Sequence, residues 1–226
     1  AQRGAQVVIG KLLGETCDLN FLKRLADFDR CIVGMILELS VYFGIDDDRI
    51  EALVENLMTE QMADGGWNCR RHRKPYPHHS SFHTTLNVLD GLRDYLELRP
   101  DAPQAARVVT AERSARELLL EHRLFRSDKT GNIIHENFAK MSYPHRWFYD
   151  FLRGLEHFAR ARAPRDPRIQ EGIDLLRQYQ TSDGRWRNQV RHSGKIFFTL
   201  EPGREPSRWN TLRALRVLRW WEENAS

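Results

Sequence analysis

Apolar residues recur along much of the chain with the spacing of amphipathic helices. Over 48–58 and again over 166–176 they follow the i, i+3, i+4, i+7 pattern that places them on one helix face. Each stretch begins with an Asp, which can accept hydrogen bonds from free backbone N–H groups, and Pro167 suits a first helical turn. The pattern therefore predicts two helices with one polar and one buried face.

Other stretches are apolar on more of their circumference. Four of them begin near Asp29, Ser81, His145 and Ser207, each with a polar or aromatic first turn. One further amphipathic stretch covers 105–120. We therefore expect outer amphipathic helices to alternate with more deeply buried inner helices.

A short motif is repeated at the end of two of the outer helices. Gln61-Met-Ala-Asp-Gly-Gly-Trp67 recurs as Gln180-Thr-Ser-Asp-Gly-Arg-Trp186, and 125–131 holds a diverged copy of the same turn. The Asp-Gly pair favours a tight turn after a helix. Because a helix hairpin cannot bury its apolar face alone, such repeats stack side by side.

About four hairpins are expected on this repeat logic, and they predict an all-α fold, an α/α toroid forming one domain over 1–226. A closed ring usually needs more hairpins. The chain also opens inside a predicted helix, 5–13, so we expect either an open ring or an additional hairpin upstream. The first turns of the inner helices would then surround one mouth of a central cavity.

Composition narrows the partners. The net charge is +4, and the arginines are spread along the chain apart from one basic run, Arg70 to Lys74. A solvated surface explains this distribution, and nothing in it is typical of a nucleic-acid-binding protein. We expect a small-molecule or lipid substrate, and the basic run leaves contact with a membrane surface open. The sequence leaves the oligomeric state open.

Cysteine usage and hydropathy bear on the compartment. Cys17, Cys31 and Cys69 are an odd number without paired spacing, which favours a reducing, cytoplasmic location over a disulfide framework. No apolar run reaches 18 residues, so no transmembrane helix is predicted.

The two Gln…Trp segments resemble the repeats of the terpenoid cyclase and protein prenyltransferase superfamily, in which squalene–hopene cyclases carry such repeats. The chain looks most similar to short bacterial proteins of squalene-cyclase-like or prenyltransferase-like type, through 64–69, 79–85 and 206–213. The resemblance implies an α/α toroid whose cavity takes an isoprenoid or another lipid. It does not specify the reaction.

Two motifs of that superfamily are incomplete. Class II cyclases use an Asp-x-Asp-Asp acid, whereas the only acidic triplet here, Asp46–Asp48, is interpreted as the capped start of a helix. Prenyltransferases bind zinc through Asp-x-Cys and a distant His. Asp29-Arg-Cys31 fits that pattern in three residues only, so Asp29 is interpreted as an N-cap and Cys31 as a small buried side chain.

The first candidate site follows the first repeat. Trp67, Cys69, His79 and His83 are predicted to line the cavity, with His83 as a catalytic group. Cys69, His79 and His83 could together supply three zinc ligands, but half a zinc motif is a weaker explanation than a hydrogen-bonded polar cluster. We therefore predict no cofactor, with zinc as the alternative.

The second candidate site is the segment Arg146, Trp147, Tyr149 and Asp150. An acid among aromatic rings at a cavity wall could act as a general acid, with Tyr149 as a second catalytic group. Trp147, Tyr149 and Trp209 could stabilise a cation through their ring faces. The alternative is that Asp150 pairs with an Arg and the aromatic side chains belong to the core.

A third candidate site lies at the start of the last helix, where Arg208, Trp209 and Asn210 could bind an anion such as a diphosphate. The alternative is that Ser207 is an ordinary N-cap and Arg208 an ordinary ion-pair partner. The hypothesis to test is that the members of all three candidate sites converge on one pocket, namely Cys69, His79, His83, Trp147, Tyr149, Asp150, Arg208, Trp209 and Asn210.

Three functions follow from these sites. The first is binding or conversion of an isoprenoid or other lipid. The second is a carbohydrate lyase of the (α/α) toroid type, for which Tyr149, His83, Asn210 and Arg146 are suitable residue types. The third is a binding or scaffold protein without catalysis.

Overall fold

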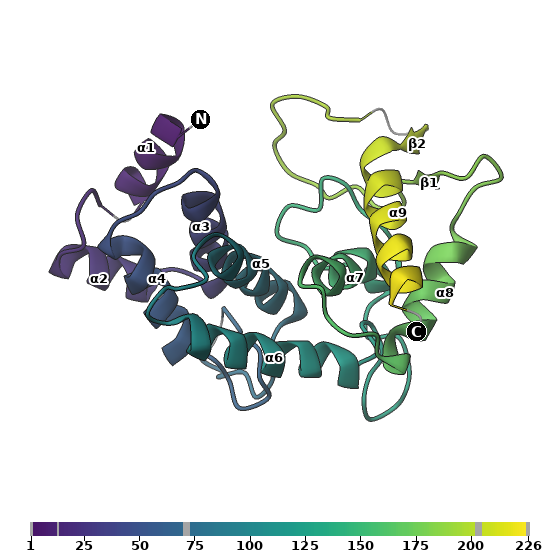
Figure 1. Cartoon of the computed structure of the whole chain (residues 1–226), viewed down its shortest axis with the longest axis horizontal. Coiled ribbons are helices and arrows are strands. Elements are labelled where there is room, and N and C mark those ends of the chain that lie inside the picture. The colour runs from purple at the N-terminus through teal and green to yellow at the C-terminus, as the bar shows by residue number, and fades with distance from the viewer. Residues whose placement is uncertain (1, 13, 70–72, 202–204, 225–226) are drawn as a thin grey trace. The chain divides into compact units, whose positions relative to one another are not determined.

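A computed structural model describes residues 2–12, 14–69, 73–201 and 205–224 of the chain. It is built of helices, with one small antiparallel sheet that the sequence analysis did not predict. Arg70 and Arg71, part of the predicted basic run, lie outside the described residues. In chain order the elements are α1 (Gln2–Leu12), α2 (Leu19–Asp27), α3 (Arg30–Tyr42), α4 (Asp48–Thr59), α5 (Phe82–Leu98), α6 (Ala105–Glu121), the 3-10 helix η1 (Glu136–Ala139), α7 (Phe151–Arg160), the 3-10 helix η2 (Pro167–Ile169), α8 (Gln170–Gln178), β1 (Trp186–Arg187), β2 (Pro206–Ser207) and α9 (Arg208–Glu223) (Figure 1).

The helical prediction is confirmed, and most of the predicted helix starts are met. α3, α5 and α9 begin directly after Asp29, Ser81 and Ser207, and the Ser207 hydroxyl accepts a bond from the Asn210 N–H at 2.9 Å. Asp47 caps α4, as the acidic triplet predicted. Asp29 has the backbone of an N-cap, but its carboxylate makes no capping bond and instead accepts one from Arg73.

The third inner helix does not begin at His145. α7 starts at Phe151, because Asp150 is the residue that caps it, accepting a hydrogen bond from the Arg153 N–H at 2.9 Å. The preceding segment is a turn that contains a cis Tyr143–Pro144 bond. The outer helix predicted over 166–176 is likewise divided, into η2 and α8.

Contacts divide the chain into two compact units, unit 1 (Ala1–Leu118) and unit 2 (Leu119–Ser226). The single domain over 1–226 and the toroid stay predictions. In unit 1 the inner helices α3 and α5 pack against each other, and in unit 2 α7 packs against α9 (Figure 1).

Glycine permits the close approach of α3 and α5. A Cβ atom on Gly34 would lie 2.5 Å from the Asn87 carbonyl oxygen, and one on Gly91 would lie 2.5 Å from the Gly34 carbonyl oxygen. Both obstacles are backbone atoms, which cannot rotate away as a side chain can. The two helices therefore depend on these glycines for their spacing.

The repeated motif forms the same hydrogen bonds in both units. The Trp67 indole N–H donates to the Leu57 carbonyl oxygen at 2.7 Å, and the Trp186 indole N–H donates to the Leu176 carbonyl oxygen at 2.7 Å. Both rings are fully buried. Each Trp thereby donates to a carbonyl in the last turn of an outer helix, where backbone acceptors lack the regular helical partner. The Leu57 carbonyl also accepts a weaker bond from the Glu60 N–H at 3.3 Å.

The same two tryptophans also contact the inner helices. The Trp67 backbone N–H donates to the Thr85 hydroxyl at 3.0 Å, and the Trp186 backbone N–H donates to the Thr211 hydroxyl at 3.1 Å. Each Thr lies in the first turn of its helix. One residue thus joins the end of an outer helix to the start of the next inner helix. We call this arrangement the Trp clamp.

The diverged third turn is confirmed over 125–131, where the sequence has no Trp to form a clamp. Its Ser127 N–H donates to the Asn132 carbonyl oxygen at 2.8 Å, and Gly131 has a φ of +70°. Here the Tyr149 hydroxyl donates to the Leu124 carbonyl oxygen at 2.7 Å. A phenol approaching from the following segment therefore takes the place of the indole.

Replacing Gly34 with Ala is expected to lower the free energy of unfolding by about 1–3 kcal/mol, because the new methyl group overpacks the α3–α5 contact. Gly4→Ala is the matched control: it lies in α1, and a Cβ atom added there would have no other atom within 4 Å. The control should be neutral or stabilising by up to about 1 kcal/mol. Urea titration measures both. Equal effects of the two variants would contradict the close approach.

Replacing Trp186 with Phe should lower the free energy of unfolding by about 1–3 kcal/mol, because the buried Leu176 carbonyl loses its donor. Thermal and urea unfolding followed by circular dichroism measure the change. Trp147→Phe is the control, since this ring is 44% exposed. A loss in the control as large as in Trp186→Phe would argue against the clamp.

Candidate functional site

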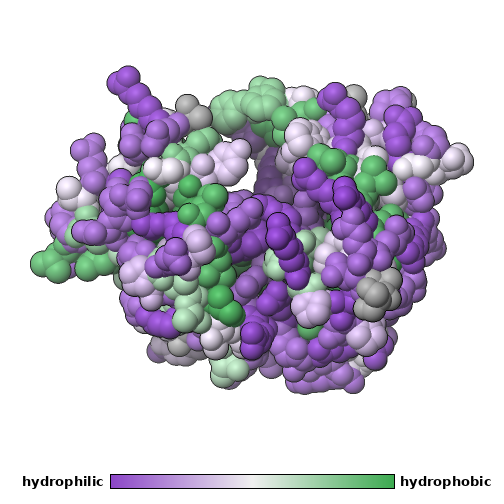
Figure 2. All heavy atoms as spheres, in the orientation of Figure 1, coloured by the Kyte–Doolittle hydropathy of each residue, from purple (hydrophilic) through white to green (hydrophobic). Residues whose placement is uncertain are grey.

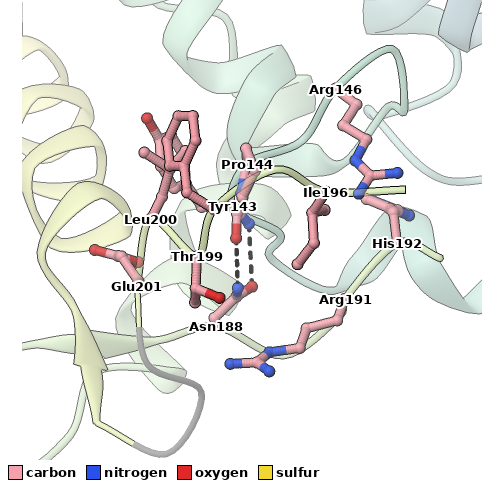
Figure 3. Close-up of a pocket in the computed structure, with 11 residues that line it drawn as sticks. Tyr143, Pro144, Arg146, Asn188, Arg191, His192, Ile196, Thr199, Leu200 and Glu201 are labelled. Atoms are coloured by element: carbon pink, nitrogen blue, oxygen red, sulfur yellow. Dashed lines mark hydrogen bonds between the residues drawn. The ribbon is translucent and has the colours of Figure 1, made fainter. Parts of the chain in front are cut away.

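A pocket of about 120 Å³ opens in unit 2 between the turn at 143–146 and the long loop that joins β1 to β2. Figure 3 shows the side chains that surround it. The lining residues are Tyr143, Pro144, Arg146, Asn188, Arg191, His192, Ile196, Phe198, Thr199, Leu200 and Glu201.

One wall of the pocket is held by Asn188. Its side-chain oxygen accepts a bond from the Tyr143 N–H at 3.1 Å, and its amide N–H donates to the Tyr143 carbonyl oxygen at 2.6 Å, the two dashed lines in Figure 3. The Tyr143 ring stacks on Trp209, with 5.4 Å between ring centroids. The wall is therefore tied both to the β1–β2 loop and to the first turn of α9.

A buried polar network supports this wall from behind. One Asp150 oxygen accepts bonds from the Ser142 N–H at 3.1 Å and the Ser142 hydroxyl at 2.6 Å. Arg213 of α9 donates to the Ser142 carbonyl oxygen at 3.3 Å and to the Glu156 carboxylate at 2.6 Å. These bonds fix Ser142, the neighbour of Tyr143, between α7 and α9.

The opposite end of the pocket is basic. Arg146 has a left-handed φ of +53°, and its guanidinium donates to the Ser193 carbonyl oxygen at 2.6 Å. Next to it lies His192 (Figure 3), whose ring stacks on Phe148 with 3.7 Å between centroids. In the part of the chain that the structure describes, the buried Nε2 atom of His192 has no hydrogen-bond partner. A buried imidazole nitrogen without a partner calls for an explanation, and a water molecule or a ligand atom bound to it is one.

Burial lowers the pKa of His192 below its ordinary value of 6.5, and the positive charge of Arg146 lowers it further. The Asp150 carboxylate acts in the opposite direction. An anion placed beside Nε2 would offset the first two effects, because it stabilises the imidazolium.

The outer edge of the pocket is apolar. Ile196, Phe198 and Leu200 line it while remaining 58%, 72% and 41% exposed. Figure 2 shows hydrophobic residues where Figure 1 places this loop, and further hydrophobic areas elsewhere on the same face. Glu201 follows. One of its oxygens accepts a bond from the Trp209 N–H at 3.1 Å, and the other has no partner within the described ranges.

The predicted residues of unit 2 occupy different environments. Arg146 lines the pocket, Trp209 reaches it through Tyr143, and Trp147 stacks on Phe148 at 3.9 Å. Arg208 is exposed. Of these residues Arg146 belongs to the lining, and Trp209 contacts the lining residue Tyr143.

The other three predicted residues of unit 2 are buried. Tyr149 is enclosed, and burial raises its pKa well above 10. Asp150 acts as the cap of α7 and as the acceptor for Ser142. Asn210 accepts a bond from Arg213 at 3.2 Å. The sequence alternative paired Asp150 with an Arg, and the structure gives a bond from the Arg153 backbone N–H to the Asp150 carboxylate.

The predicted site residues of unit 1 do not form a cluster of metal ligands among the described residues. Trp67 is core, His79 is exposed, and His83 is partly buried on α5. Among the described residues, no three His, Cys, Asp or Glu side chains lie close enough to hold a metal ion. Cys69 instead contacts Cys31, with 3.0 Å between the sulfur atoms. The convergence of the nine residues on one pocket stays a prediction.

Sequence reasoning missed most of the pocket lining. Tyr143, Asn188, Arg191 and His192 carry no motif, and they come together only because the β1–β2 loop folds back onto the turn before α7. One signal was available. Ile196, Phe197 and Phe198 form an apolar run inside a polar, Gly-containing loop, where such side chains have no helix face to join.

Comparison with protein-family models, with curated proteins and with solved structures gave no match. Within the described ranges, no helix combines the length and the apolar character needed to cross a bilayer. The geometry and charge of the site itself are therefore the basis for a functional proposal.

The imidazole of His192 should titrate below pH 6.5 in the free protein. Because the unfolded chain then binds more protons, the free energy of unfolding should fall as the pH drops from 6.5 through the folded-state pKa. Two-dimensional NMR of the imidazole carbons measures the titration, and His192→Gln should remove this part of the pH dependence. A folded-state pKa above 6.5 would show that the ring is not buried as described.

Proposed function

We propose that unit 2, as part of a helical-hairpin protein of α/α-toroid type, binds a small amphipathic ligand of isoprenoid or other lipid class. The ligand would carry an anionic head and an apolar tail. The observation that carries this proposal is the division of one pocket into a basic end and an apolar edge. The basic end holds Arg146, Arg191 and the His192 Nε2 atom, which has no partner among the described residues.

The charge balance of the pocket supports an anionic head. Two guanidiniums line it against one carboxylate, and Figure 3 shows Glu201 on the side opposite Arg146 and His192. A guanidinium presents several N–H donors in a planar fork that matches phosphate and carboxylate oxygens. Because the Arg146 side chain is already held by the Ser193 carbonyl, little ordering is needed when a ligand binds.

The apolar edge supports a hydrocarbon tail. Ile196 and Phe198 are more than half exposed, and covering apolar surface contributes roughly 25 cal/mol per Å². Both belong to the same loop as His192 and Arg191. A molecule bound by its head at the basic end would therefore lay its tail along this loop.

The lyase hypothesis gains no support from the geometry. It requires an accessible Tyr149 hydroxyl, and that hydroxyl is buried and donates to the Leu124 carbonyl. The proposal is accordingly one of binding, and it assigns no bond-breaking role to Asp150 or Tyr149.

Binding of farnesyl diphosphate, measured by isothermal titration calorimetry, tests the proposal. Farnesol supplies the tail alone and inorganic pyrophosphate the head alone, and each should bind at least about tenfold more weakly, a difference of about 1.4 kcal/mol. Binding of the diphosphate should also raise the pKa of His192 in the NMR titration. Equal affinity for all three compounds, or none for any, would sink the proposal.

Variants locate the site. Arg191→Gln and Phe198→Ser should each weaken binding by roughly tenfold, through loss of a charge-assisted contact and of apolar cover respectively. Arg219→Gln is the matched control, because its guanidinium is 79% exposed, pairs with Glu223 and does not line the pocket. An equal loss in the control would show that the chain attracts anions nonspecifically.

A further inference from the structure

Two cysteines far apart in sequence meet in unit 1. Cys31 lies in the first turn of α3, and Cys69 follows the Trp clamp of the first repeat, with 3.0 Å between their sulfur atoms. Both are free thiols and both are partly exposed. The separation is about 1 Å longer than the disulfide bond that would join them.

The surroundings of Cys69 are those of a hydrogen-bond acceptor. Its sulfur accepts from the Cys31 N–H at 3.3 Å and from the Thr84 hydroxyl at 3.2 Å. The sulfur also lies 3.0 Å from the Cys31 sulfur, and once Cys69 is a thiolate the Cys31 thiol is the donor of this third hydrogen bond. Three donors, one of them a backbone N–H at a helix N-terminus, stabilise a thiolate at Cys69.

These contacts shift the pKa values of the two thiols in opposite directions. The hydrogen bond from Cys31, followed by that from Thr84, lowers the pKa of Cys69 to about 6 against the cost of burial. The pKa of Cys31 is raised by the same hydrogen bond and by burial. Asp29 opposes the thiolate, and it is itself engaged by Arg73. The buried Arg30 guanidinium is the further charged group that interacts with Cys69.

We propose that Cys31 and Cys69 form a thiol–disulfide exchange site that reacts with small-molecule disulfides. Cys69 is the attacking sulfur and Cys31 the resolving one. The site lies in unit 1 and does not depend on the ligand proposed for unit 2. It needs neither a metal nor a further residue beyond the donors already described.

The exchange proceeds in two balanced steps. The Cys69 thiolate attacks one sulfur of a disulfide RSSR, forming a Cys69–S–SR mixed disulfide and releasing RS⁻. Cys31 then gives up its proton, which ends on released RS⁻, and attacks the Cys69 sulfur to expel the second RS⁻. The protein pair is oxidised by two electrons to the Cys31–Cys69 disulfide. RSSR is reduced to one RSH and one RS⁻, and this RS⁻ takes up a proton from water in place of the one that Cys69 released on ionising.

Exposed Cys17 supplies an internal reference, because burial and the nearby Asp48 raise its pKa above 9. At pH 7 Cys69 is mostly thiolate whereas Cys17 is mostly protonated, and this difference outweighs the weaker intrinsic nucleophilicity of the more acidic thiolate. Cys69 should therefore react several-fold faster at pH 7. At pH 9 Cys17 should react faster than Cys69, because a larger share of it is then thiolate and its thiolate is the stronger nucleophile.

The experiment treats the whole chain with oxidised glutathione and follows intact mass and peptide mass. Wild type and Cys17→Ser should lose two hydrogens as the internal disulfide closes. Cys31→Ser, whose hydroxyl keeps the donor to Cys69, should stop at a single glutathione adduct on Cys69. In the Cys69→Ser variant, Cys31 should react with glutathione no faster than Cys17 does.

Thr84→Val tests the donor role without removing a cysteine. It keeps the side-chain shape but removes a donor, so the pKa of Cys69 should rise. Adduct formation at Cys69 should then slow at pH 6, whereas at pH 9, where the thiolate is formed in either case, it should be at least as fast as in the wild type because nucleophilicity rises with pKa. Faster reaction of Cys17 than of Cys69 at pH 7 would overturn the proposal. So would a wild-type protein that accumulates glutathione without closing the internal disulfide.

Discussion

The Trp clamp is the interaction on which the rest of each unit depends. In both repeats one indole satisfies a carbonyl at the end of an outer helix, while the backbone of the same residue binds a Thr in the first turn of the next inner helix. A helix end that is buried must find partners for its free backbone groups. The clamp supplies one, and by doing so it sets where the inner helix begins relative to the outer one.

Because the clamp fixes the start of the inner helix, it also fixes the positions of the side chains next to that start. In unit 1 Cys69 lies two residues after the clamp residue Trp67. Its hydrogen-bond donor Thr84 directly precedes Thr85, the Thr that the clamp binds, so the clamp positions the thiol pair. In unit 2 Trp209 lies two residues before the clamped Thr211 and stacks on the pocket wall at Tyr143. The same scaffold therefore carries different chemistry in each unit.

The two units differ most in what connects the clamp to the inner helix. In unit 2 a long loop leaves β1, folds over the turn before α7 and returns through β2, and that excursion creates the pocket. Its position rests on two kinds of contact, the paired bonds between Asn188 and Tyr143 and the Asp150–Ser142–Arg213 network behind them. The sequence context of Asp150 suggests a catalytic acid, but in the structure its carboxylate caps α7 and binds Ser142.

The sequence by itself determined the helical class, most helix starts and the equivalence of the two Gln…Trp turns, because periodicity, caps and Asp-Gly turns act over a few residues. It placed the start of α7 wrongly, since His145 and Asp150 are both plausible caps and only packing against Ser142 selects the second. The pocket and the Cys31–Cys69 contact were decided by tertiary structure alone. The two cysteines are 38 residues apart, and the bonded pair Tyr143 and Asn188, which joins the two segments of the pocket, is 45 residues apart. No local pattern records which distant side chains the fold brings together.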